Sequence, residues 1–129
     1  MTEFAWVQAR FECSLKVGLK KLEVGARADV AAMVAIAQQT GRPDTYELAA
    51  YPDRFTVIRE KLSSVMSVNF SIDKGEIVAS LGDESACSIV RGIPTLNRDG
   101  DCVLLVKDSE WELWHFRRAA LDQLFFKNF

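Results

Sequence analysis

A helical pattern of apolar residues between positions 4 and 38 limits the folds open to this chain more than any other feature. The apolar positions recur at steps of three, four or seven, so at 100° per residue they fall in a sector about 80° wide. We therefore predict a long amphipathic helix that ends before Gly41-Arg42-Pro43, where glycine suits the residue after the last turn. The predicted core stripe consists of Phe4, Phe11, Leu15, Leu19, Leu22, Ala26, Met33 and Ala37.

The length of this predicted helix conflicts with the size of the chain. About 35 residues would span roughly 52 Å, whereas a domain of 129 residues has a diameter of roughly 36 Å. Gly18 and Gly25 each also cost up to about 1 kcal/mol relative to alanine in a helix interior. We expect either a break near Gly25 or packing of the excess length on a second subunit.

A second apolar strip runs along the same predicted helix, away from the core stripe. Its members lie within about 60° of one another, and they are Trp6, Cys13, Val17, Ala28, Ala31 and Ala35. A second apolar strip indicates a second packing partner. Two partners remain open: the C-terminal helix of the same chain, or the same helix of a dimer mate.

The middle of the chain has the two-residue period of β-strands. From Met66 to Ile72 every second residue is apolar, and the residues between are Ser67, Asn69 and Ser71. Such alternation is typical of an antiparallel sheet with one buried face and one wet face. We predict turns at 73–75, 82–85, 97–100 and 108–109, and an end to the fourth strand before Pro94. About six strands result, over residues 54–59, 65–72, 77–81, 86–91, 101–107 and 111–115.

The C-terminal region is predicted to form a short helix over residues 117–127, followed by an unusually apolar terminus. Because free termini normally fray, the apolar Phe126 and Phe129 predict docking on the sheet or on another subunit. The element order gives a single α+β domain over residues 1–129, with helices on one face of an antiparallel sheet. Its layout resembles cystatin-like and NTF2-like proteins, a likeness of arrangement that implies no function.

Composition narrows the range of functions. The 16 Lys and Arg residues stand against 18 Asp and Glu, with a net charge of −2, and the basic residues are interleaved with acids, so we predict no nucleic-acid binding. No apolar stretch approaches the ~20 residues of a membrane span, and the N-terminus lacks the pattern of a signal peptide. A single histidine and no paired cysteine motif argue against a zinc site. We expect a cytoplasmic protein without cofactor, metal or membrane contact.

Asp29 lies inside the predicted core stripe, at the same helical angle as Phe11. Burial of an unpaired carboxylate is costly and raises its pKa. One interpretation is a pocket acid that binds a ligand or acts as a general base. The other is structural: if the helix breaks near Gly25, Asp29 becomes the N-cap of a second helix, a position that aspartate favours.

The three cysteines, Cys13, Cys87 and Cys102, are odd in number and have no paired spacing, which predicts reduced thiols. A turn at Asp108-Ser109 would place Cys102 opposite His115 on an antiparallel pair, with Cβ atoms ~5 Å apart. Two interpretations of this pair remain open. It is either a thiol–imidazole site or a half-buried histidine beside an inert core thiol.

Together these patterns favour a non-catalytic binding or adaptor protein that forms a homodimer or binds an unidentified protein partner. The alternative is a small-molecule-binding or enzymatic pocket between helix and sheet, with Asp29 as its polar anchor and Cys102 and His115 as further ligand-binding candidates. No catalytic residue is predicted, because the sequence contains no phosphate-loop or nucleophile-elbow motif. The candidate interface residues are Trp6, Cys13, Val17, Phe126 and Phe129.

Overall fold

The computed structural model describes residues 3–82 and 87–129, and within them the chain has an α+β fold of three helices and seven strands. The predicted fold class is therefore confirmed, with one strand more than expected. The predicted turn at 82–85 falls largely outside the described residues. The elements are α1 (Trp6–Glu12), α2 (Leu15–Thr40), β1 (Thr45–Tyr51), β2 (Arg54–Lys61), β3 (Ser64–Asp73), β4 (Glu76–Leu81), β5 (Ser88–Leu96), β6 (Cys102–Val106), β7 (Ser109–Trp111) and α3 (Leu113–Phe126).

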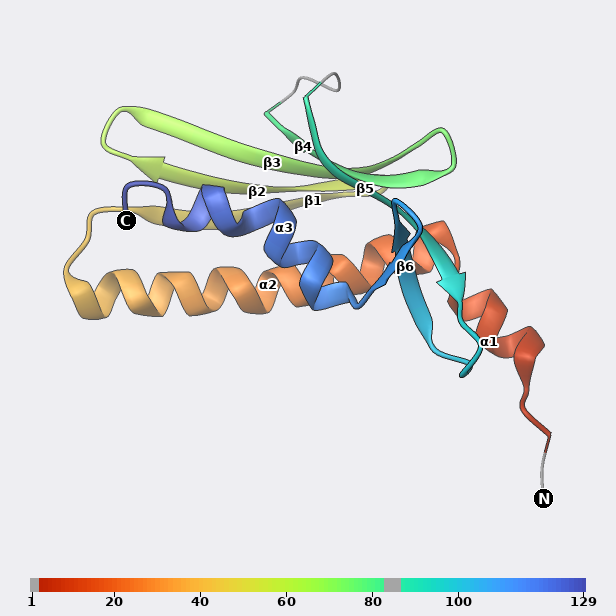
Figure 1. Cartoon of the computed structure of the whole chain (residues 1–129). Helices are drawn as coiled ribbons and strands as arrows, with labels where there is room; N and C mark the ends of the chain where they lie inside the picture. The colour runs from red at the N-terminus through yellow and green to blue at the C-terminus, as the bar shows by residue number, and fades with distance from the viewer. Residues whose placement is uncertain (1–2, 83–86) are drawn as a thin grey trace.

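The seven strands form one antiparallel sheet in which each strand pairs with the next along the chain, in the order β1 to β7. Helices α2 and α3 contact each other and lie on the same side of β1, β2 and β3 (Figure 1). The predicted placement of the helices on one sheet face is confirmed. The short α1 lies apart from this layer, beside β5 and β6.

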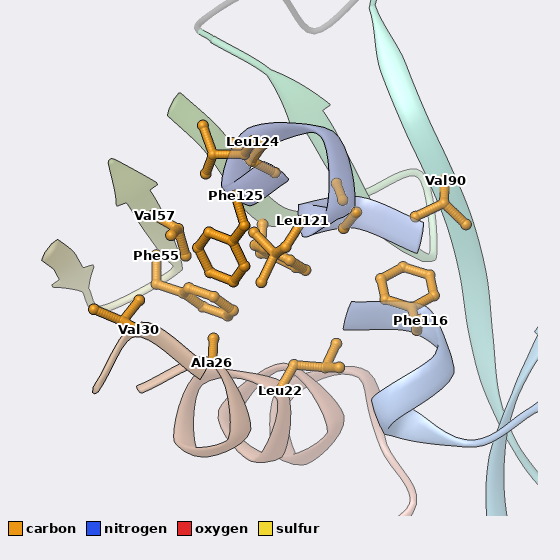
Figure 2. Packing of buried hydrophobic residues seen from close by; sticks show 14 of the residues in the cluster. Leu22, Ala26, Val30, Phe55, Val57, Val90, Phe116, Leu121, Leu124 and Phe125 are labelled. Carbon is orange, nitrogen blue, oxygen red and sulfur yellow. The ribbon is translucent and has the colours of Figure 1, made fainter. Parts of the chain in front are cut away.

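The hydrophobic core lies between α2, α3 and the sheet. Figure 2 shows Leu22 and Ala26 of α2 facing Phe55 of β2 and Leu121 and Phe125 of α3. The ring of Phe55 is fully buried and stacks on that of Phe70 with centroids 4.5 Å apart. Aromatic stacking of this kind adds to the stabilisation that buried apolar area provides.

The first predicted helix is broken at Cys13 and Ser14, and the expected break near Gly25 is wrong. Ser14 has extended backbone angles and its Oγ accepts a hydrogen bond from the Val17 amide at 3.2 Å, so it is the N-cap of α2. Helix α2 then continues through Gly25 to Thr40. Its end is as predicted, because Gly41 adopts a left-handed conformation with φ 66°.

The core stripe is confirmed for most of its length and wrong at its N-terminal end. Leu19, Leu22 and the later stripe residues are buried and Leu15 is partly buried. Phe4 and Phe11 are exposed, because the break at residues 13 and 14 directs the preceding segment toward β5 and β6 and away from the core between α2, α3 and the sheet.

The strand pattern differs from the prediction in four places, and one of them is the predicted strand 111–115, which is replaced by β7 and the start of α3. β1 was not predicted, because its sequence, with adjacent alanines, has little β-forming character. β5 continues through Pro94, although the strand was predicted to end before it. The pairing of β5 with β4 ends at Gly92, so at Pro94 the strand pairs only with β6 and the missing amide hydrogen of proline is tolerated. The β6–β7 turn is formed by Lys107 and Asp108, both at positive φ, one residue earlier than predicted.

The predicted docking of the C-terminus on the sheet is confirmed for its backbone, through Arg59 of β2, whereas Phe126 is exposed. The guanidinium of Arg42 lies 4.0 Å from the centroid of the Phe129 ring and donates a hydrogen bond to the Asn128 carbonyl at 2.9 Å. The buried Arg59 of β2 donates to the carbonyls of Leu124 and Lys127 at 2.9 and 2.8 Å, and so satisfies acceptors left open at the end of α3.

Candidate functional site

Asp29 lies in the middle of α2 and forms an ion pair with α3, so it is not an N-cap. The Nε of Arg117 donates a hydrogen bond to Asp29 Oδ2 at 2.7 Å. The Asp29 side chain is 32% exposed and the Arg117 side chain is 18% exposed. Gly25, one turn earlier on α2, leaves the space that the Arg117 guanidinium occupies. Because Asp29 is paired, its carboxylate does not have the unpaired burial expected of a pocket base.

The Asp29–Arg117 pair lines a groove of about 320 Å³ between α2 and α3. The predicted pocket for Asp29 lay between helix and sheet, whereas the structure places this carboxylate between two helices. The groove is bounded by Met33 and Ile36 of α2 and by Leu121 and Phe126 of α3. It is therefore an apolar slot whose side carries the partly exposed Asp29–Arg117 pair together with Arg118 and Asp122.

Cys102 and His115 do not form a thiol–imidazole pair. Cys102 is disulfide-bonded to Cys13, and the predicted reduced state is wrong for these two cysteines. His115 belongs to α3 and not to a strand, and its ring stacks on Trp111 with centroids 4.1 Å apart. The predicted register failed because the β6–β7 turn lies one residue earlier and β7 ends at Trp111.

The disulfide fixes the root of a short N-terminal segment, residues 3–12, which we call the arm. Helix α1 within the arm has no buried residue. Its side chains Trp6, Val7 and Phe11 are 63%, 65% and 70% exposed. Because these large apolar side chains are exposed, the arm presents an apolar surface that the single chain leaves uncovered. An isolated helix of this length is also unstable in water.

A larger groove, of about 850 Å³, lies between the first turns of α2 and the β1–β2 turn, and we call it the hairpin groove. Its apolar lining includes Leu15 and Val24 of α2, Tyr51 of β1 and Ile72 of β3. Three of these side chains, those of Val24, Tyr51 and Ile72, are among the exposed large hydrophobic residues. Sequence reasoning missed this groove because its walls come from segments that only the tertiary fold brings together.

The rim of the hairpin groove carries more positive than negative charge. Lys16, Lys20, Lys21 and Arg54 line it, together with Glu23 and Asp53. Glu23 is paired with Lys20 at 3.0 Å and with Arg27 at 3.4 Å, whereas Lys16 and Lys21 have no ion-pair partner among the described residues. The groove thus combines an apolar lining with an excess of cations.

The predicted interface residues fall into different environments. Trp6 is exposed on the arm, and Val17 is half-buried in the lining of the hairpin groove. Phe126 is exposed at the α2–α3 groove, and Phe129 is half-buried under Arg42. Cys13 is fully buried and disulfide-bonded.

One polar cluster was not predicted from the sequence. The Arg59 side chain is 3% exposed, and its Nε donates to Asp44 Oδ2 at 2.7 Å. Burial raises the pKa of Asp44, but the hydrogen bond and positive charge of Arg59, with Arg42 and Lys61 farther away, outweigh it and hold this pKa below its ordinary value. The available sequence signal was an arginine at a core-facing position of an alternating strand, opposite Met66.

Within residues 3–82 and 87–129, no three His, Cys, Asp or Glu side chains are grouped so that they could hold a metal ion. Of the helices in these ranges, none combines the length and apolar character needed to cross a bilayer.

Comparisons with known proteins add no functional assignment. No family model matches the chain, and no curated protein or solved structure matches it either. The class that can be stated is an α+β protein with a seven-stranded antiparallel meander and two helices on one face.

Proposed function

We propose that this chain is a non-catalytic binding protein that acts as a homodimer. The observation that carries the proposal is the arm, in which Trp6, Val7 and Phe11 stand exposed on a helix without a buried residue. Clustered exposed apolar side chains mark interaction sites more often than they mark free surface, and aromatic residues dominate binding energy at interfaces.

Two further features support self-association over capture of a small substrate. The hairpin groove offers a second uncovered apolar surface beside the start of α2. The one carboxylate that the sequence singled out, Asp29, is neutralised by Arg117. A closed two-fold dimer would cover the same surfaces on both copies.

Sedimentation velocity of the full chain at micromolar concentrations tests the proposal. We expect a concentration-dependent dimer with twice the 14.5 kDa mass of the chain. A single monomeric species at every concentration would rule out the homodimer.

The α2–α3 groove supports a second candidate function, the binding of a small molecule. Its motivating observation is the partly exposed Asp29–Arg117 pair beside the apolar Met33 and Leu121. Ligand pockets typically combine apolar walls with a few polar groups that fix orientation. A thermal-shift screen should yield compounds that stabilise the wild type and not Asp29→Asn. If no compound discriminates between the two proteins, this candidate fails.

A cytoplasmic location remains part of the proposal and rests on the sequence patterns alone. The Cys13–Cys102 disulfide argues in the opposite direction, because structural disulfides are rare in reducing compartments. Fractionation of cells that express the tagged chain decides between the cytoplasm and an oxidising compartment.

A further inference from the structure

We infer that the hairpin groove is the receptor for the arm of a second copy of this chain. The inference rests on the proposed homodimer and names the contact that forms it. Each copy would place its arm, residues 3–12, in the groove of the other. One type of contact would thereby cover both uncovered apolar surfaces of the chain.

The two surfaces match in chemistry. Val7 and Phe11 are four residues apart on α1 and so project from one face of the helix. The hairpin groove offers Val24, Tyr51 and Ile72 as exposed apolar counterparts. Its volume of about 850 Å³ is at the upper end of the range for binding pockets, so large apolar side chains can enter.

The charges of the two surfaces are complementary. The arm carries two acids, Glu3 and Glu12, and one cation, Arg10. The groove rim has four cationic and two acidic residues, and its Lys16 and Lys21 have no ion-pair partner in the described part of the chain. Complementary charge speeds association and fixes register, while the apolar contacts supply most of the affinity.

The arm is held away from the groove of its own chain. Cys13, at its root, is bonded to Cys102 of β6, and α1 contacts β5 and β6. The ring of Phe4 lies against Gly100 in the β5–β6 loop, where an added Cβ would be 2.7 Å from Phe4 Cζ. Figure 1 shows α1 beside β5 and β6. The groove is bounded instead by the β1–β2 turn, so the arm of the same chain does not fill it, and we assign it to the arm of a second copy.

Chain connectivity makes this exchange reciprocal. The arm ends at Glu12, and Leu15, the first residue of α2, already lines the groove. A two-fold axis near the start of α2 therefore brings each arm to the opposite groove. Such an arrangement is closed and does not propagate into filaments.

A complementation experiment tests the inference. The arm variant is Val7→Ser/Phe11→Ser, the groove variant is Val24→Ser/Tyr51→Ser, and Val65→Ser, at an exposed position outside both surfaces, is the matched control. Circular dichroism melts establish that each variant is folded. By sedimentation velocity, we expect the control to dimerise like the wild type, and each double variant alone to have a dimer dissociation constant raised about tenfold or more.

The decisive sample is an equimolar mixture of the two double variants. A heterodimer between them keeps one intact contact, because the groove variant supplies a normal arm and the arm variant a normal groove. We therefore expect the mixture to associate more strongly than either variant alone. If either double variant dimerises as tightly as the wild type, or if the mixture associates no more strongly than each variant alone, this inference is overturned and the homodimer stands. A monomeric wild type overturns both.

Discussion

The guanidinium of Arg117 occupies the space that a side chain at Gly25 would need, and from there its Nε donates to Asp29 at 2.7 Å. A glycine with poor helix propensity therefore admits the arginine that joins α2 to α3. Gly25, Asp29 and Arg117 therefore act as one structural unit, which sequence spacing alone does not reveal.

This relationship predicts a coupling between residues 25 and 117. Gly25→Ala should gain about 1 kcal/mol from helix propensity, but in the wild type Arg117 must move and weaken its ion pair with Asp29. In an Arg117→Ala background the alanine meets no guanidinium, and the full gain should appear. Urea unfolding of the four proteins in this cycle measures the difference. Equal gains in both backgrounds would show that the two residues are independent.

The buried Arg59 predicts a large loss of stability on substitution. Arg59→Met leaves the buried Asp44 carboxylate without its partner and the end of α3 without a donor. Removal of one member of a buried ion pair costs about 3–5 kcal/mol. Denaturant unfolding should show this loss, whereas Arg98→Met, at an exposed position of the β5–β6 loop, should change the unfolding free energy by less than about 1 kcal/mol. Similar losses for the two variants would contradict the role of Arg59.

Asp44 predicts a specific acid sensitivity. Its pKa is lowered in the folded state by Arg59, so its contribution is present above the unfolded pKa of about 3.9 and is lost as the pH falls through the lower folded value. The unfolding free energy should therefore fall less steeply below about pH 4 in Asp44→Asn than in the wild type. Parallel pH profiles for the two proteins would contradict the assignment.

The disulfide predicts a covalent link that peptide mapping detects directly. Without reductant, mass spectrometry should find the peptide that contains Cys13 joined to the one that contains Cys102. Closing a loop over a separation of 89 residues stabilises a fold by about 2–5 kcal/mol, so Cys13→Ser should lower the melting temperature. Cys87→Ser, at an exposed position outside this disulfide, should change it little. Recovery of unlinked peptides would contradict the pairing.

Local hydrophobic patterns predicted much of the fold, because a helical or a strand period continued over many residues is compatible with only one type of element. The stripe from Leu19 to Ala37 and the alternation around Phe70 each place one face in the core. The break at residues 13 and 14 also had a local signal, since Ser14 is a favoured N-cap. The continuous apolar spacing on either side concealed it, and Phe11 was consequently placed in the core.

The candidate sites were less predictable, because they depend on contacts between distant segments. The Cys13–Cys102 bond and the Arg59 contacts with the end of α3 join positions far apart in the chain. No spacing rule connects such positions. A shift of one residue in the β6–β7 turn was enough to invalidate the predicted pairing of Cys102 with His115.

Sedimentation equilibrium of the full wild-type chain, compared with Val7→Ser/Phe11→Ser, tests the central claim most directly, because the exposed arm is the surface on which the account depends. We predict a monomer–dimer equilibrium at micromolar concentration for the wild type and a predominantly monomeric, equally folded variant. A wild type that sediments with the 14.5 kDa mass of one chain at every concentration would contradict the account.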